Sequence, residues 1–405
     1  MLYQAYQACA DATDPVRSMA RALAAASSRF NDGAVGESPI QRVAAAYELM
    51  ALAGLSHHRP DYGITTVEVD GEPAAVHEEI VHRTPFCSLL RFRKDTPNPQ
   101  PRVLMVAPLS GHFATLLRGT VRTMLQDHDV YLTDWHNIRD VPLMAGRFDL
   151  DDFIEHIIAF LEVLGPGTHL VSVCQPTVGV LAAAALMAAD QHPAQAASMT
   201  LMAGPIDTRI NPTQVNELAQ SKPIEWFERN LIGTVPRRYT GALRRVYPGF
   251  VQLAAFMSMN LPRHAKTFLD LRGHLANGDL DKAEPILTFY HEYFAMMDLP
   301  AEFYLQTIRG VFQDHLLPLG QLTSRGRPVE PGKIRRTALL TVEGEKDDIC
   351  AIGQTLAAQD LCSGLMPYRK QHHVQAGVGH YGVFNGRRWQ QQIYPRVRDF
   401  IHSHD

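Results

Sequence analysis

Residues 167–187 read GTHLVSVCQPTVGVLAAAALM and decide the fold. The first eight residues, which end at Cys174, form a short apolar run that predicts a buried strand. The residues that follow are apolar and rich in alanine, which predicts a buried helix directly after the strand. A side chain at such a turn projects above the sheet, where the helix N-terminus and a backbone N–H can stabilise negative charge. The stretch therefore predicts an α/β arrangement with Cys174 at a candidate reactive position.

The turn departs from the usual Gly-x-Ser-x-Gly pattern of a nucleophile at such a position. Residues 172–176 read SVCQP, so both glycines are absent. Ser172 is small enough for a tight turn, and Pro176 falls in the first helical turn, where a missing N–H costs little. Free cysteines are also among the most often buried residues. This segment alone leaves Cys174 either as a nucleophile or as a core cysteine.

Two later segments supply the other groups that a nucleophile needs. Residues 336–349 read RTALLTVEGEKDDI, an apolar strand followed by a loop that carries Asp347. Residues 371–382 read QHHVQAGVGHYG, a short strand followed by a glycine-flanked loop that carries His380. Nucleophile, acid and histidine follow in this order in the α/β-hydrolase fold, and open α/β sheets place ligands at the carboxyl ends of their strands. The pattern predicts a Cys174–Asp347–His380 triad and acyl transfer through a thiolate.

The acid and the histidine have rivals nearby. Asp348 is adjacent to the predicted acid, and its alternative role is to cap a helix that is expected to begin near Ile349. Asp207 follows the next predicted strand after the nucleophile, which is another place for the acid. His372 and His373 lie within a predicted strand, so we interpret them as packing or surface residues.

The oxyanion hole is expected to consist of two backbone N–H groups. One belongs to Gln175, directly after the nucleophile. The other is expected from the loop after the predicted strand at 101–108, with Leu109 and Ser110 as the candidate donors. His112 lies in the same loop and is expected to cap the next helix or to pack within the loop.

Five segments resemble the intracellular poly(3-hydroxybutyrate) depolymerases of bacteria, and the resemblance runs over nearly the whole chain. The segments are VSVCQPTVGV (171–180), VEGEKDDI (342–349), GVGHYGVFNG (377–386), YLTDWHNIRDVP (131–142) and FYHEYFAMMDLPAEFYLQTIRGVFQDHLLP (289–318). More distantly, the chain is similar to polyhydroxyalkanoate synthases, whose nucleophile lies in a Gly-x-Cys-x-Gly pattern. Pro176 departs from that pattern, which argues against a synthase.

The resemblance implies an activity as well as a fold. It implies a cysteine triad carried here by Cys174, Asp347 and His380, and hydrolysis of amorphous storage polyester on granules inside the cell. The expected partners are the polyester granule and its coat proteins, with a cytoplasmic location. The oligomeric state is left open, with a homodimer as one candidate. Two other classes stay open: an acyltransferase that uses coenzyme A or a growing chain as acceptor, and a non-catalytic granule-coat protein.

The composition fits a soluble enzyme of more than minimal size. The 405 residues are 46% hydrophobic and 20% charged, which allows a large core. A net charge of −4 without a long basic run argues against a nucleic-acid partner. The sequence contains no run of about 18 apolar residues, so we predict no membrane-spanning helix. The N-terminal residues MLYQAY do not resemble a signal peptide.

The cysteines and the motifs that are missing bear on redox state and cofactors. The five cysteines show no paired spacing, which fits reduced thiols rather than a disulfide framework. We find no zinc-ligand spacing, no Walker loop and no Rossmann glycine pattern. The sequence therefore predicts neither a metal site nor an organic cofactor.

The chain is expected to fold in four parts. Residues 1–60 are expected to form an N-terminal helical extension, which packs on the core or touches a granule surface. Alternating strands and helices at 61–203 predict the first part of an α/β-hydrolase core, a mostly parallel sheet with helices on both faces. Residues 204–332 predict an inserted, mainly helical cap, and 333–405 complete the core.

The predicted cap carries the candidate substrate-binding residues. A polyester chain is apolar, so it needs an apolar groove with few hydrogen-bond donors. The aromatic and methionine side chains of the cap either line such a groove or pack its helices together. The candidates are Phe289, Tyr290, Tyr293, Phe294, Met297 and Trp226.

Overall fold

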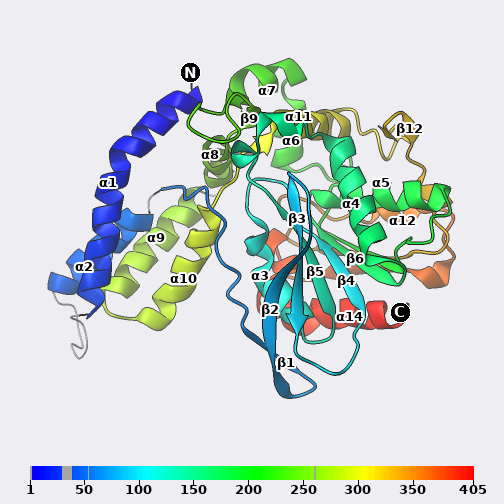
Figure 1. Ribbon diagram of the computed structural model, residues 1–405, viewed down its shortest axis with the longest axis horizontal. Helices are drawn as coiled ribbons and strands as arrows, with labels where there is room; N and C mark the ends of the chain where they lie inside the picture. Colours follow the sequence, from blue (N-terminus) through cyan, green and yellow to red (C-terminus); the bar gives the residue numbers. More distant parts are fainter. Residues whose placement is uncertain (1, 30–38, 53, 260) are drawn as a thin grey trace.

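A nine-stranded sheet forms the centre of the computed structural model, which describes residues 2–29, 39–52, 54–259 and 261–405 (Figure 1). The strands, in sheet order, are β1 (Thr66–Val69), β2 (Glu72–Arg83), β3 (Cys87–Lys94), β5 (Asp129–Trp135), β4 (Arg102–Val106), β6 (Thr168–Val173), β7 (Ser198–Met202), β13 (Ala338–Gly344) and β14 (Lys370–Gln375). Neighbouring strands from β5 to β14 are parallel, whereas β1, β2 and β3 are antiparallel to their neighbours. The predicted mostly parallel sheet is confirmed.

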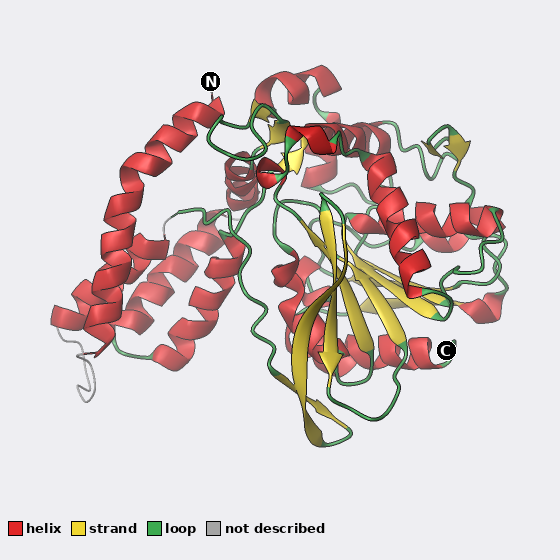
Figure 2. Cartoon of the chain, in the orientation of Figure 1, coloured by secondary structure: helices red, strands yellow, loops and turns green. Residues whose placement is uncertain are grey.

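Helices cover both faces of this sheet (Figure 2). They are α3 (Arg118–Met124), α4 (Leu150–Leu164), α5 (Pro176–Ala189), α12 (Ala357–Leu361), α13 (Gly386–Arg388) and α14 (Tyr394–His402). The pair α4 and α5 packs together, as does the pair α3 and α14, and the pairs lie on opposite sides of the sheet (Figure 1). The side chains of Asp149 and Asp152 accept each other's backbone N–H groups, a capping box that fixes where α4 begins.

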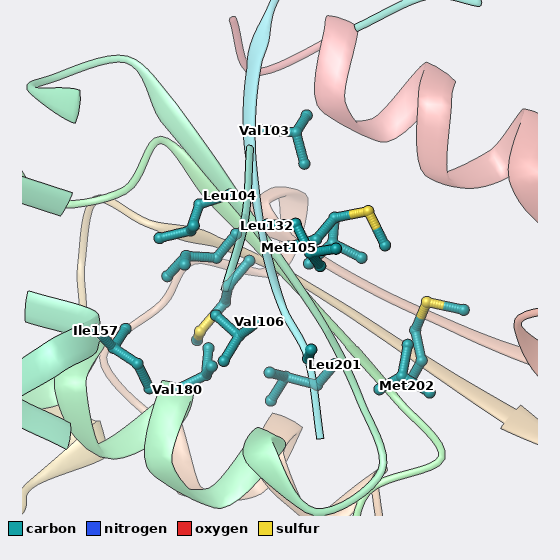
Figure 3. Packing of buried hydrophobic residues seen from close by; sticks show 14 of the residues in the cluster. Val103, Leu104, Met105, Val106, Leu132, Ile157, Val180, Leu201 and Met202 are labelled. Carbon is teal, nitrogen blue, oxygen red and sulfur yellow. The ribbon is translucent and has the colours of Figure 1, made fainter. Parts of the chain in front are cut away.

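The core lies between the parallel strands and their helices. All residues of β6 and of β13 are buried, as expected for strands covered on both faces. Figure 3 shows Val106, Leu132 and Leu201 of the sheet close to Ile157 of α4 and Val180 of α5. Each buried side chain of this size contributes about 1.5–3 kcal/mol to folding. The ends of these strands are therefore held in fixed positions.

A mainly helical region separates β7 from β13. Its helices are α6 (Gln214–Gln220), α7 (Ile224–Leu231), α8 (Gly249–Met259), α9 (Leu261–Ala276), α10 (Leu280–Tyr293) and α11 (Ala301–Thr307). The region also contains a small sheet of β8 (Gly233–Thr234), β9 (Arg245–Tyr247) and β10 (Leu299–Pro300), and a hairpin of β11 (Thr323–Ser324) and β12 (Arg327–Pro328). Sequence analysis did not predict these strands, because two or three residues are too few to show an alternating pattern.

Two N-terminal helices join this region to form a lobe beside the sheet. Helix α1 (Leu2–Arg29) packs on α2 (Pro39–Leu52), α2 packs on α9, and α9 packs on α10 (Figure 1). We call these four helices the helical lobe. The turn-forming residues Asn31, Asp32 and Gly33, at which the sequence predicts a break of the N-terminal extension into two helices, lie outside the described residues. No helix in the described ranges is both long and apolar enough to span a membrane.

The helical lobe, together with α8 and the segment after α10, contains a cluster of buried side chains that is distinct from the core of the sheet. The cluster consists of Leu52, Leu253, Leu271, Ala283, Tyr290, Tyr293 and Met296. Two of the candidate substrate-binding residues, Tyr290 and Tyr293, therefore serve the packing of the lobe as well. The lobe approaches the loops that follow β13 and β14, because residues of α9 and α10 line a cavity together with Ile349 and Tyr381.

Candidate active site

Cys174 lies at the turn between β6 and α5 in a strained backbone conformation. Its φ is +67°, in the left-handed region that costs a non-glycine residue roughly 1–3 kcal/mol. The turn is held by neighbours on both sides: the N–H of Cys174 donates to the carbonyl of Met202 (2.8 Å), and the hydroxyl of Thr177 donates to the carbonyl of Cys174 (2.9 Å). The strain is therefore supported by the sheet and the helix, as at a nucleophile turn.

Close packing at this turn is achieved without the usual flanking glycines. Ser172 takes one of those positions and is fully buried, and Pro176 takes the other as the first residue of α5. The room that the flanking glycines would provide comes instead from Gly204, after the neighbouring strand β7. A Cβ on Gly204 would lie 2.0 Å from the hydroxyl of Thr177. A glycine distant in sequence thus lets the chain after β7 approach the first turn of α5.

Asp347 and His380 are brought together by the adjacent parallel strands β13 and β14. Oδ2 of Asp347 lies 2.8 Å from Nδ1 of His380, and both side chains are almost completely buried. The other carboxylate oxygen, Oδ1, accepts the N–H groups of Ile349 (2.9 Å) and Cys350 (2.8 Å). The carboxylate is therefore fixed in position by backbone donors while it faces the imidazole.

The structure separates the rival acids from the histidine. Asp348 is exposed, and the helix expected to begin near Ile349 begins only at Ala357, as α12. The N–H groups of Ile349 and Cys350 donate to Asp347 and not to Asp348. The prediction that Asp348 caps a helix is therefore wrong. Asp207 binds the guanidinium of Arg209 through both carboxylate oxygens, at 2.8 Å and 2.7 Å.

The neighbouring strand histidines are packing residues. Nδ1 of His372 lies 2.9 Å from the hydroxyl of Thr341, and Nε2 of His373 lies 3.0 Å from the side chain of Gln375. His372 thus contacts the neighbouring strand β13 and His373 makes a contact within β14, as expected of residues that pack within a strand. Neither of these contacts involves the triad.

His380 also interacts with Cys174. Burial opposes the charged imidazolium, but the neighbouring Cys174 and Asp347 outweigh it and raise the pKa of His380 well above its ordinary value. With Nδ1 directed at the carboxylate, Nε2 is left for the thiol. A protonated imidazole favours a thiolate on its partner, so the three side chains form a constellation suited to nucleophilic attack.

Candidate oxyanion donors surround the turn. In the part of the chain that the structure describes, the backbone N–H groups of Gln175 and Ser110 have no hydrogen-bond partner. The N–H of Leu109, the third predicted donor, donates to Oε1 of Gln175 at 3.1 Å. The side chain of Gln175 thus ties the loop after β4 to the nucleophile turn, and the N–H groups of Gln175 and Ser110 stay available to an oxyanion.

The same loop is anchored to the segment after α10. The carbonyl of Gly111 accepts the N–H of Met297 (2.7 Å), and a Cβ on Gly111 would lie 2.3 Å from Oε1 of Gln252. His112 packs against the rings of Phe256 and Tyr293, and burial lowers its pKa to about 4, so it is neutral. This is the packing role expected of His112.

A cavity of about 320 Å³ lies between the helical lobe and the loops that carry the acid and the histidine. Of the predicted substrate residues, Phe289, Tyr290 and Tyr293 line it. Ile349 and Tyr381 also line it, and they follow Asp347 and His380 in the sequence. Burial raises the pKa of Tyr381, and the nearby Tyr293 and Cys174 act in the same direction.

The other predicted substrate residues lie elsewhere. Met297 is fully buried in the core of the sheet, and Phe294 packs in the lobe and faces a different cavity beside Leu52 and Arg59. Trp226 lies on α7, 37% exposed, with its ring against Phe227.

Several residues of the cavity were missed by sequence reasoning. They include Arg263, His264, Ile349 and Tyr381. A usable signal existed only for the last two, which are close to the predicted acid and histidine in the chain. Within the described residues, no group of three or more His, Cys, Asp or Glu side chains is arranged to hold a metal ion.

The solved structures to which this chain is similar are distant from it in sequence. A search of curated protein sequences finds no match. Similar solved structures include a 2-hydroxy-6-oxo-6-phenylhexa-2,4-dienoate hydrolase from Rhodococcus sp. strain RHA1, 12% identical with a TM-score of 0.44 over 81% of this chain and 99% of that chain. Another is a thermophilic esterase from Thermogutta terrifontis, 15% identical with a TM-score of 0.41 over 84% of this chain and 98% of that chain. These likenesses are too distant to carry a functional argument.

One family model matches half of the chain. The model described as PHB de-polymerase C-terminus matches residues 203–405, which hold the mainly helical region, Asp347 and His380. PHB is poly(3-hydroxybutyrate), so the match supports ester hydrolysis as the class of reaction. The chain has the α/β-hydrolase fold and belongs to the PHB depolymerase family.

Proposed function

We propose that this protein hydrolyses the ester bonds of amorphous intracellular poly(3-hydroxybutyrate) to 3-hydroxybutyrate oligomers and monomer. The observation that carries the proposal is the contact of His380 with both Cys174 and Asp347, at the ends of three parallel strands, in a chain of this family. The proposal includes a cytoplasmic site of action on the polyester granule.

The reaction begins with the thiolate of Cys174 and the imidazolium of His380. The thiolate attacks the ester carbonyl, and the oxyanion that forms accepts hydrogen bonds from the N–H groups of Gln175 and Ser110. His380 donates its proton to the leaving alkoxide as the C–O bond breaks, so an alcohol-ended fragment departs and a thioester remains on Cys174. Asp347 holds the imidazole in orientation and stabilises its charged form throughout.

Water completes the cycle. Neutral His380 takes a proton from a water molecule, whose oxygen attacks the thioester carbonyl. The tetrahedral intermediate collapses, the C–S bond breaks, and a free acid leaves with the thiolate restored. The atoms balance as one water consumed for each ester bond cleaved.

The shape of the site supports a mobile polymer strand as substrate. The lobe places Phe289, Tyr290 and Tyr293 over the acid–histidine side of the site. A cavity lined largely by apolar and aromatic side chains suits a polyester chain. A single strand of amorphous polymer can enter such a cavity, whereas a strand fixed in a crystal lattice cannot leave its neighbours to do so.

The experiment compares acid release from amorphous granules and from crystallised granules of the same polymer. The expected result is hydrolysis of the amorphous form with little on the crystalline form. Equal rates on both would contradict a site restricted by the lobe. The same assay with added coenzyme A detects an acyltransferase, because acyl-coenzyme A would then replace free acid as the product.

A further inference from the structure

The cavity beside the triad is lined on one side by a positively charged residue, Arg263. The cavity is lined largely by apolar and aromatic side chains, and none of its lining residues is a carboxylate. Arg263, on α9, is exposed at this cavity and forms no ion pair with any described residue. Arg263 also lies close to two other residues of the cavity: burial raises the pKa of Tyr290 and Arg263 opposes this rise, while burial lowers the pKa of His264 and Arg263 acts in the same direction.

The cavity borders the loops that carry Asp347 and His380, where the alcohol fragment would depart in the proposed reaction. Ile349 donates its N–H to Asp347, and Tyr381 follows His380 directly; both line the cavity. The oxyanion donors lie on the loop after β4 and at the start of α5. Because His380 must protonate the leaving oxygen, the departing fragment has to lie next to the acid–histidine loops.

The departing fragment of this polymer ends in a carboxylate. In poly(3-hydroxybutyrate), the fragment that leaves as an alcohol retains the carboxyl end of the chain, while the acyl fragment retains the hydroxyl end. A short departing fragment therefore has an apolar body and one negative charge. An apolar cavity with one unpaired guanidinium is complementary to such a fragment, since arginine binds carboxylates through two parallel N–H donors.

We propose that Arg263 binds the free carboxylate at the end of the polyester chain, so that the enzyme prefers carboxylate-ended 3-hydroxybutyrate oligomers. This inference rests on the proposed function and specifies how its substrate is placed. Arg263 acts as a specificity-determining residue on the departing side and takes no part in bond cleavage.

The test compares short 3-hydroxybutyrate oligomers with their methyl esters at the carboxyl end. The wild-type protein should favour the free acids in kcat/KM by roughly threefold to tenfold, a modest preference because Arg263 is solvent-accessible. Arg263→Gln should remove the preference by raising KM for the free acids while kcat changes little, and Arg263→Lys should retain part of it. Added salt should reduce the preference of the wild type.

Lys266→Gln is the matched control, since it removes one positive charge from the same helix at a side chain that pairs with Asp270 and does not line the cavity. It should keep the preference. A neutral aryl ester of butyrate separates the two proposals: no turnover of any ester contradicts the proposed function, whereas turnover without a free-acid preference contradicts only the role of Arg263. Stronger competitive inhibition by inorganic phosphate than by 3-hydroxybutyrate would also contradict it, because it would indicate a phosphate site.

Discussion

The carboxyl ends of β6, β13 and β14 and the helical lobe contribute to one site in different ways. At the strand ends, the reactive groups are fixed by backbone: Cys174 by a strained turn, and Asp347 by two N–H donors. In the lobe, Phe289 and Tyr293 both lie on α10, which packs against a separate cluster of buried side chains. The difference teaches that the fold fixes the reactive groups by backbone and the cavity by helix packing; under the proposed function, the lobe then selects the substrate.

Removal of the nucleophile should have the largest effect. Cys174→Ala should lower ester hydrolysis by at least about 10⁴-fold, since no covalent intermediate can form. The fold should remain, because a small side chain replaces another. Turnover of a soluble ester and the unfolding transition measure both outcomes, with Cys9→Ala at an exposed cysteine as the control. Substantial activity in Cys174→Ala would show that the sheet edge does not supply the nucleophile.

Substitution of two adjacent carboxylates at the sheet edge should lower kcat by very different amounts. Asp347→Asn should cost on the order of 10³–10⁴ in kcat, because the imidazole loses the acceptor that orients it. Asp348→Asn, at an exposed side chain, should cost little. In Asp347→Asn the pKa of His380 should fall, which alkylation of Cys174 as a function of pH detects. Equal losses in the two variants would overturn the assignment of Asp347.

Two aromatic residues with nearly equal exposure allow the role of the cavity to be tested against that of the rest of the cap. Phe289 is 38% exposed and lines the cavity, whereas Trp226 is 37% exposed and does not. Phe289→Ala should raise KM for oligomers roughly threefold to tenfold through lost apolar contact, with kcat nearly unchanged. Trp226→Ala should leave both constants unchanged. If the two variants behave alike, the cavity does not bind the substrate.

The smallest effect on turnover is expected from a substitution of Asp298, at the point where the lobe is attached to the core. The hydroxyl of Tyr3, on α1, donates to Asp298, whose other oxygen accepts the N–H of Gly249 at 2.8 Å. Burial raises the pKa of Asp298 to about 6, from an ordinary value of 3.8. The raised pKa means that this carboxyl contributes its stability in full below about pH 4 and loses it as the pH rises toward about 6.

Asp298→Asn removes this titration. The difference in the free energy of unfolding between wild type and variant should therefore shift against the wild type between about pH 4 and 6, by up to about 3 kcal/mol. Denaturant unfolding at several pH values measures the difference, and Asp270→Asn at a more exposed carboxylate is the control. A difference that stays constant over this range would show that Asp298 does not titrate there.

The strand ends could be predicted from the sequence better than the lobe. Cys174 and Asp347 each follow an apolar run, and His380 follows a short, more polar segment; all three segments become strands of the parallel sheet, so the proximity of the three residues follows from topology. The choice between Asp347 and Asp348 needed coordinates, because adjacent side chains of a loop diverge in a direction that no pattern fixes. Membership of the cavity also depends on how helices pack, which explains why Phe289 lines it and Met297 does not.

Two further features could not be read from the sequence. The small residue that permits the nucleophile turn, Gly204, follows a different strand from Cys174. The hydrogen bond between the side chain of Gln175 and the N–H of Leu109 joins loops about 66 residues apart, which is a tertiary contact without a local signature. The division of the chain into four parts at 60, 203 and 332 stays a prediction.

Identification of the acylated residue tests the central claim most directly. The protein is mixed with a short 3-hydroxybutyrate ester, quenched with acid during turnover, digested and analysed by mass spectrometry. The account predicts a 3-hydroxybutyryl group on the peptide that contains Cys174, and no such group in Cys174→Ala. An acyl group on any other residue, or continued turnover by Cys174→Ala without one, would contradict a thiolate nucleophile at the end of β6.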